Sequence, residues 1–169
     1  EIGLGIPAEP LFRSSIHTKK DDWLVYIACL EHYTIPYQHK ENYHNQDKIY
    51  SNLAKYNLFS DICFDDLKNV LPRAIDRLYD SEYQKSEKFK KKEERFFVME
   101  EMIRVVIKIK QQENSLDNEF ANQAYQYLIS NRKELKLGVP DEDTLSLFVG
   151  NVDSLQIKSD LIEDRKSVV

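Results

Sequence analysis

A long stretch without glycine or proline dominates this sequence and limits the folds open to it. The segment from Glu82 to Gln112 lies within it, and a continuous helix over that segment would be about 45 Å long at roughly 1.5 Å per residue. Its first half is polar, and its second half places apolar residues at helical spacing: Phe96, Met99, Ile103, Val106 and Ile107. Only four glycines and five prolines occur in 169 residues, which favours helices over a turn-rich β fold. We therefore predict an all-α fold of several amphipathic helices with one long helix.

Composition divides the chain into an arm, a helical domain and a tail. Residues 1–18 are rich in glycine and proline and lack periodicity, which is typical of an extended arm. Residues 19–138 carry the apolar spacing of amphipathic helices, so we predict one helical domain there. Residues 139–169 are acidic, with apolar pairs separated by polar residues. This acidic tail is expected either to dock on a partner or to be partly disordered.

Two apolar-faced segments flank an acidic pair between Asp47 and Glu94. A helix over residues 47–58 should turn at residues 60–61 into a second helix that begins with Asp65 and Asp66. Two carboxylates suit a first helical turn, where free N–H groups and the helix dipole favour negative charge by about 0.3–1 kcal/mol each. The apolar face of the second helix consists of Leu67, Val70, Leu71, Ala74, Ile75 and Leu78. Pro72 is expected to kink this helix or to open a new one.

A series of short features follows in a fixed order along the same part of the chain. They are Tyr50, Asn52, Ala54, Tyr56-Asn57, Asp65-Asp66, Ala74-Ile75-Asp76-Arg77-Leu78, Tyr83 and the lysines from Lys85 to Lys92. Further on come Tyr125, Tyr127-Leu128 and Arg132-Lys133-Glu134. This order resembles the small non-haem "14 kDa" subunit of the mitochondrial cytochrome bc1 complex, also described as its subunit 7 or ubiquinone-binding-protein-like subunit.

The resemblance implies a non-catalytic structural or assembly subunit of complex III, which supports electron transport from ubiquinol to cytochrome c. Such a subunit would be peripheral on the matrix side of the mitochondrial inner membrane and would contact cytochrome b and the core subunits. The partner-docking candidates are Asp65, Asp66, Arg77, Tyr83, Lys88, Lys91 and Arg95. The alternative is a soluble helical adaptor that binds another protein through its arm and acidic tail.

The lysine-rich start of the long predicted helix raises the question of phosphate binding. Between Lys85 and Lys110, nine basic side chains are interleaved with five acidic ones, as in a solvated helix crossed by ion pairs four residues apart. Phe89 alone provides no stacking platform for single-stranded nucleic acid, and the net charge of the chain is −5. We expect solvation or protein docking here, with anionic lipid as an alternative and no nucleic acid.

No catalytic or cofactor-binding signature stands out in the sequence. It lacks a Gly-rich phosphate loop, a Gly-x-Ser-x-Gly elbow and a Cys-x-x-Cys pair, and His39 and His44 lack the helical spacing of a metal-binding pair. Cys29 and Cys63 lie among apolar residues and are expected to be buried thiols. No apolar run approaches the roughly 20 residues of a membrane-spanning helix. We therefore expect a protein that is not an enzyme, binds no cofactor or metal and spans no membrane.

Overall fold

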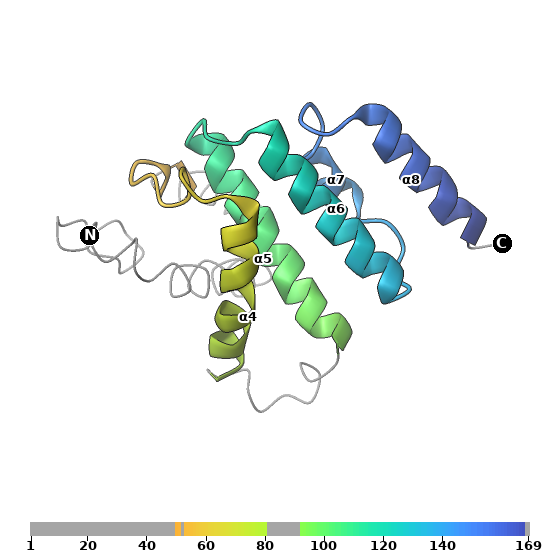
Figure 1. Ribbon diagram of the computed structural model, residues 1–169, viewed down its shortest axis with the longest axis horizontal. Coiled ribbons are helices and arrows are strands. Elements are labelled where there is room, and N and C mark those ends of the chain that lie inside the picture. Colours follow the sequence, from red (N-terminus) through yellow and green to blue (C-terminus); the bar gives the residue numbers. More distant parts are fainter. Residues whose placement is uncertain (1–49, 52, 81–91, 168–169) are drawn as a thin grey trace, which may run out of the picture. The chain divides into compact units, whose positions relative to one another are not determined.

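The computed structural model describes residues 50, 51, 53–80 and 92–167, and this part of the chain is all-α with no strand (Figure 1). Its helices are α4 (Phe64–Asp80), α5 (Lys92–Gln112), α6 (Asn118–Glu134), α7 (Glu142–Ser146) and α8 (Ser154–Ser167). The fold class predicted from the sequence is therefore confirmed. In the described part of the chain, no helix is long and apolar enough to cross a membrane.

The chain forms two compact units, residues 1–115 and residues 116–169. The first contains α4 and α5, and the second contains α6, α7 and α8. This division differs from the boundary at residue 138 that the composition predicts. The acidic stretch after Pro140 forms α7 and α8 and makes contacts with α6, and its docking on a partner stays a prediction. The predicted arm, residues 1–18, lies outside the described residues.

Helix α5 is buried on nearly every side. The apolar row predicted from its sequence, Phe96, Met99, Ile103, Val106 and Ile107, is buried as expected. The side chains between these positions are buried too, namely Val98, Glu100, Met102, Val105, Ile109 and Lys110. A helix that is apolar around most of its circumference belongs in an interior rather than at a surface. α5 is therefore the core of the first unit. The predicted extension of this helix back to Glu82 lies outside the described residues.

Helix α4 packs along α5 through one apolar face (Figure 1). The buried side chains of this face are Leu67, Leu71, Ala74 and Ile75. The helix continues through Pro72, so the proline neither ends it nor opens a second one. Proline has no backbone N–H, so one hydrogen bond of the helix is missing at Pro72. Because Pro72 is exposed, the missing bond lies on the side of the helix that water can reach. Burial of the opposite face offsets that loss.

The segment before α4 is fastened to α5 by polar contacts. The ammonium group of Lys108 lies 5.6 Å from the ring centroid of Tyr50, and the Phe59 N–H donates to Oε1 of Glu113 at 3.2 Å. Burial raises the pKa of the Glu113 carboxyl, although this hydrogen bond and one from Ser115 oppose the shift. The helical turn after Tyr50 ends near residue 54 rather than at residue 58 as predicted, because Asn57 has a φ of 50°.

Cys63 departs from the sequence-based expectation. It is a free, exposed thiol, whereas its apolar neighbours predicted a buried one. Phe64 and Ile62, on either side of it, take the buried positions instead. Cys29 lies outside the described residues.

In the second unit, α6 and α8 run side by side in the same direction, and α7 lies in the connection between them (Figure 1). α6 begins after Asp117, whose Oδ1 accepts the N–H of Phe120 at 2.7 Å. Asp117 is therefore the N-cap. The buried side chains of α6 are Phe120, Ala121, Ala124, Tyr125, Leu128 and Ile129. Tyr127 and Leu135 are only half-buried.

Helices α5 and α6 end in the same way. After α5, Asn114 has a φ of 58° and the Ser115 N–H donates to the Lys110 carbonyl at 2.9 Å. After α6, Lys136 has a φ of 57° and the Leu137 N–H donates to the Arg132 carbonyl at 2.8 Å. A second bond, from the residue with positive φ back to the helix, completes a Schellman motif at each end. Neither helix uses the glycine that this position favours.

Candidate functional site

Three of the residues predicted to dock a partner are placed with their side chains. Asp65 and Asp66 are exposed in the first turn of α4. Arg95, near the start of α5, donates to Oδ1 of Asp76 in α4 at 2.8 Å. Asp76 lies about 15 Å further along α4 than Asp66, at roughly 1.5 Å per residue. The structure therefore does not gather these three residues into one site, and it gives Arg95 an ion pair within its own unit.

The other predicted docking residues cannot be placed as side chains. Arg77 belongs to α4, but its side chain lies outside the described part of the chain. Tyr83, Lys88 and Lys91 fall in residues 81–91, which also lie outside it. The proposed lipid or protein docking of the lysine run therefore stays a prediction. His39 and His44 also lie outside the described residues, so the expectation that they bind no metal stays a prediction.

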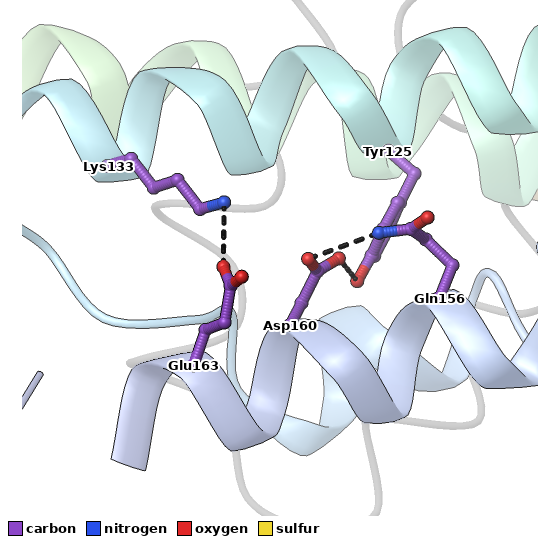
Figure 2. Close-up of polar contacts among 5 residues, drawn as sticks. All are labelled: Tyr125, Lys133, Gln156, Asp160 and Glu163. Carbon is purple, nitrogen blue, oxygen red and sulfur yellow. Dashed lines mark hydrogen bonds and ion pairs between the residues drawn. The ribbon is translucent and has the colours of Figure 1, made fainter. Parts of the chain in front are cut away.

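A buried hydrogen bond joins α8 to α6 (Figure 2). The Tyr125 hydroxyl donates to Oδ2 of Asp160 at 2.7 Å, and the Gln156 amide donates to Oδ1 of the same carboxylate at 3.2 Å. Tyr125 is fully buried and Asp160 is 6% exposed. Because each carboxylate oxygen receives a donor, the hydrogen bonds offset the loss of hydration. The ring of Tyr125 also meets Phe148 edge to face, with 5.3 Å between centroids.

The environment of Tyr125 keeps its hydroxyl in the donor state. Burial raises the pKa of Tyr125 well above its ordinary value of 10.0, and the hydrogen bond to Asp160 raises it further. Both effects act in the same direction, because a phenolate would be desolvated and would face a carboxylate. Tyr125 therefore remains protonated throughout the physiological range.

Next to this hydrogen bond, a pocket of about 610 Å³ opens between the end of α6 and α8. It is lined by Ile129, Arg132, Lys133, Lys136, Leu137, Gly138, Val139, Asp160, Glu163 and Asp164. The basic side chains come from the end of α6 and the loop after it, and the acidic ones come from α8. Lys133 pairs with Glu163 at 3.4 Å (Figure 2).

The loop that closes this pocket is held from both sides. Arg132 donates to the carbonyl oxygens of Gly138 at 3.1 Å and Val139 at 3.3 Å. On the other side, a Cβ atom built on Gly138 would lie 3.1 Å from Oδ1 of Asp164. The loop after α6 therefore comes closest to Asp164 of α8 at Gly138, where the absence of a side chain allows the close approach. The charged groups of this pocket hold the second unit together, so we assign the pocket a structural role.

The outward side of α8 differs from the side that faces α6. Leu155 is 70% exposed and Ile162 is 52% exposed, and Val149, in the loop before α8, is 70% exposed. Leu155, Lys158, Ile162 and Arg165 recur at steps of three and four, which places them within one sector of about 80° at 100° per residue. We call these four residues the outer face of α8. Lys158 and Arg165 are also exposed.

The sequence pointed to Ile162 only as part of the apolar pair Leu161-Ile162 in the acidic tail, without a helical register that joins it to Leu155. The signal that could have found the face was the seven-residue step from Leu155 to Ile162, with a basic residue three positions after each of them. Tyr125 and Asp160 could not have been paired from the sequence, since 35 residues separate them.

Chemical groups suited to metal binding do not converge in the part of the structure that is described. Within it, no group of three or more His, Cys, Asp or Glu side chains is placed to hold a metal ion. Comparisons with protein families, with curated proteins and with solved structures gave no match for this chain.

Proposed function

We propose that this protein is a non-catalytic structural or assembly subunit of a multiprotein complex, and specifically of the mitochondrial cytochrome bc1 complex. The observation that carries the proposal is the group of exposed apolar side chains in the second unit, Val149, Leu155 and Ile162. Single exposed apolar residues are common on soluble proteins. Leu155 and Ile162, however, lie two turns apart on one face of a helix, and such an arrangement is typical of a protein-binding surface.

The orientation of α8 supports binding as the role of this surface. Its one buried side chain among the described residues is the carboxylate of Asp160, while Leu155 and Ile162 are exposed and Ile157 and Leu161 are half-buried. Packing within the chain alone would favour the opposite orientation, with leucine and isoleucine inside. A partner that covers Leu155 and Ile162 would remove this apolar area from water.

The identity of the complex comes from the resemblance along residues 50–92. That stretch includes α4, with Asp65 and Asp66 exposed in its first turn and available to basic residues of a neighbouring subunit. The subunit would be peripheral, on the matrix side of the inner membrane. It would support electron transport through contacts with cytochrome b and the core subunits.

The test is to follow the tagged full-length chain in cells of its source. Mitochondrial membranes would be solubilised in a mild detergent and separated by native electrophoresis. We expect the chain to migrate with the bc1 complex and to co-purify with cytochrome b. Replacing Leu155 and Ile162 together with serine should reduce this association, while a Lys55→Ser, Arg73→Ser control, also at exposed positions, should not. Recovery of the chain only as a free species would contradict the proposal.

A soluble helical adaptor is the second candidate. The observation that favours it is that the exposed apolar residues of the second unit lie in residues 139–169, the tail through which an adaptor was predicted to bind. The two candidates differ in one measurement. An adaptor would be recovered in the soluble fraction with a soluble partner, and the double serine variant would lose that partner instead of the bc1 subunits.

A further inference from the structure

The side of α8 that faces its own unit carries three acidic side chains beside the half-buried Ile157 and Leu161. Asp160 accepts two hydrogen bonds there, Glu163 pairs with Lys133, and Asp164 lies against Gly138. The acidic side chains of the helix are thus used within the second unit. The outer face, formed by Leu155, Lys158, Ile162 and Arg165, remains available to a partner.

The outer face is basic within an acidic unit. Residues 116–169 contain ten acidic and six basic side chains, yet each apolar residue of the outer face is followed three positions later by a cation, Lys158 or Arg165. Both cations are exposed. A surface with two apolar contacts and two adjacent positive charges is complementary to an acidic segment that also carries apolar side chains.

A second copy of the chain fits this face poorly. Two α8 helices packed through their outer faces would bring Lys158 and Arg165 of one copy against the same cations of the other, and like charges across an interface oppose association. Two apolar side chains per copy are also few for an interface of the usual size, which buries about 800 Å² on each partner.

A membrane surface fits less well than a protein. Helices that lie in the bilayer interface present a broad apolar side with aromatic or leucine residues along it. The outer face of α8 offers only Leu155 and Ile162, in a chain whose net charge of −5 opposes approach to anionic lipid.

We propose that the outer face of α8 binds an acidic amphipathic helix of a partner protein, with its apolar residues over Leu155 and Ile162 and its carboxylates beside Lys158 and Arg165. This inference rests on the proposed function, because it names the chemistry of the neighbouring subunit that covers the face. The partner helix would carry leucine-like residues and glutamate or aspartate at steps of three and four.

The experiment measures binding of two labelled synthetic peptides to the purified full chain by fluorescence anisotropy. One peptide is a heptad repeat with leucines on one face and glutamates beside them, and the other has lysines in place of the glutamates. We expect the acidic peptide to bind at least about tenfold more tightly, since opposite charges meet in one case and like charges in the other. Equal affinity for the two peptides would overturn the proposal.

Three variants assign the preference to the outer face. Lys158→Glu with Arg165→Glu should invert it, and Leu155→Ser with Ile162→Ser should weaken acidic-peptide binding by about tenfold. Lys55→Glu with Arg73→Glu makes the same change in net charge at exposed positions of the first unit and should change the affinity less than about twofold. All six positions are exposed, and helical circular dichroism and the melting curve should confirm that each variant folds. Equal losses in both charge-reversal variants would contradict a specific site.

Two further measurements test the other possible occupants of the outer face, a membrane surface and a second copy of the chain. Tight binding to phosphatidylcholine–phosphatidylserine vesicles that Lys158→Glu with Arg165→Glu abolishes, without any peptide preference, would indicate a membrane surface and overturn the proposal. A dimer in sedimentation velocity that Leu155→Ser with Ile162→Ser converts to a monomer would indicate a second copy and overturn it too.

The peptide assay uses purified protein, so its failure alongside intact co-purification of the bc1 complex would reject this inference and leave the proposed function standing. If the purified chain prefers the acidic peptide but is found free in cells, the proposed bc1 function is rejected and this inference stands.

Discussion

Helices α5 and α8 show two different ways in which this chain fixes a helix. Buried side chains cover more than half of the circumference of α5, and Phe97, Glu101, Arg104 and Lys108 occupy the remaining sector. α8 touches its unit through one side, where the only buried residue in its described part is Asp160. The first helix is held by removal of apolar area from water, worth about 25 cal/mol per Å². The second is held by hydrogen bonds to a buried carboxylate, each worth about 1–3 kcal/mol, and by one exposed ion pair worth about 1 kcal/mol or less, beside the half-buried Ile157 and Leu161.

This difference indicates which part of the molecule supplies stability and which part remains available for binding. α5 uses most of its apolar residues internally, and its exposed apolar side chain is Phe97. α8 buries a carboxylate, leaves Ile157 and Leu161 half-buried and exposes Leu155 and Ile162. The strength of each attachment can be measured separately.

The largest expected effect comes from one substitution made in both helices. Ile103→Ala in α5 removes a fully buried side chain and should lower the free energy of unfolding by about 3 kcal/mol, through lost transfer energy and the cavity left behind. Ile162→Ala in α8 makes the same chemical change at a side chain that is 52% exposed and should cost less than about 0.5 kcal/mol. Urea denaturation monitored by circular dichroism measures both. Similar losses at the two positions would show that the comparison between the helices is wrong.

An intermediate effect is expected at the hydrogen bond between Tyr125 and Asp160. Asp160→Ala leaves a buried hydroxyl without an acceptor, and Tyr125→Phe leaves Oδ2 of a buried carboxylate without its donor, so each should cost about 1–3 kcal/mol. The double variant should cost less than the sum of the two, because no hydroxyl is then stranded. Lys133→Ala, which removes only the exposed ion pair with Glu163, is the control and should cost less than about 0.5 kcal/mol. Additive losses in the double-mutant cycle would mean that the two side chains do not stabilise each other.

The same tyrosine gives the sign of a pH effect. The pKa of Tyr125 is raised above 10.0 in the folded protein, so the neutral hydroxyl is favoured by folding. Its contribution to stability is complete below about pH 10 and is lost as the pH rises towards the folded pKa. Tyr125→Phe should remove this part of the alkaline loss of stability.

The smallest expected effect concerns the two helix ends. Lys136→Gly should raise the free energy of unfolding by about 0.5 kcal/mol, because glycine adopts a positive φ without the cost that a β-carbon imposes. Part of this gain is offset by the greater freedom of glycine in the unfolded chain. Asn114→Gly at the end of α5 should give a smaller gain, since asparagine tolerates positive φ better than lysine. A larger gain at Asn114 than at Lys136 would contradict this explanation.

The sequence predicted the helices of the first unit better than the arrangement of the second. The apolar spacing from Phe96 to Ile107 is strong and correctly indicated a core helix, and Asp65 and Asp66 do lie in a first turn. α8 was not predicted, because its buried position is occupied by Asp160 and a search for apolar periodicity passes over a carboxylate. The partner of that carboxylate, Tyr125, lies on a different helix. A hydrogen bond between residues so far apart in the chain leaves no local pattern.

The polar side of α8 also bears on what happens when the helix detaches. Helices attached by few contacts open more often than those in a core, and hydrogen exchange reports such local opening. If α5 left its place, it would expose a continuous hydrocarbon surface, and surfaces of that kind drive aggregation. α8 would instead return the buried Asp160 carboxylate to water, together with the half-buried Ile157 and Leu161. Its departure therefore exposes less hydrocarbon than the departure of α5 would, and the hydrogen bonds that it breaks can form again when the helix rebinds.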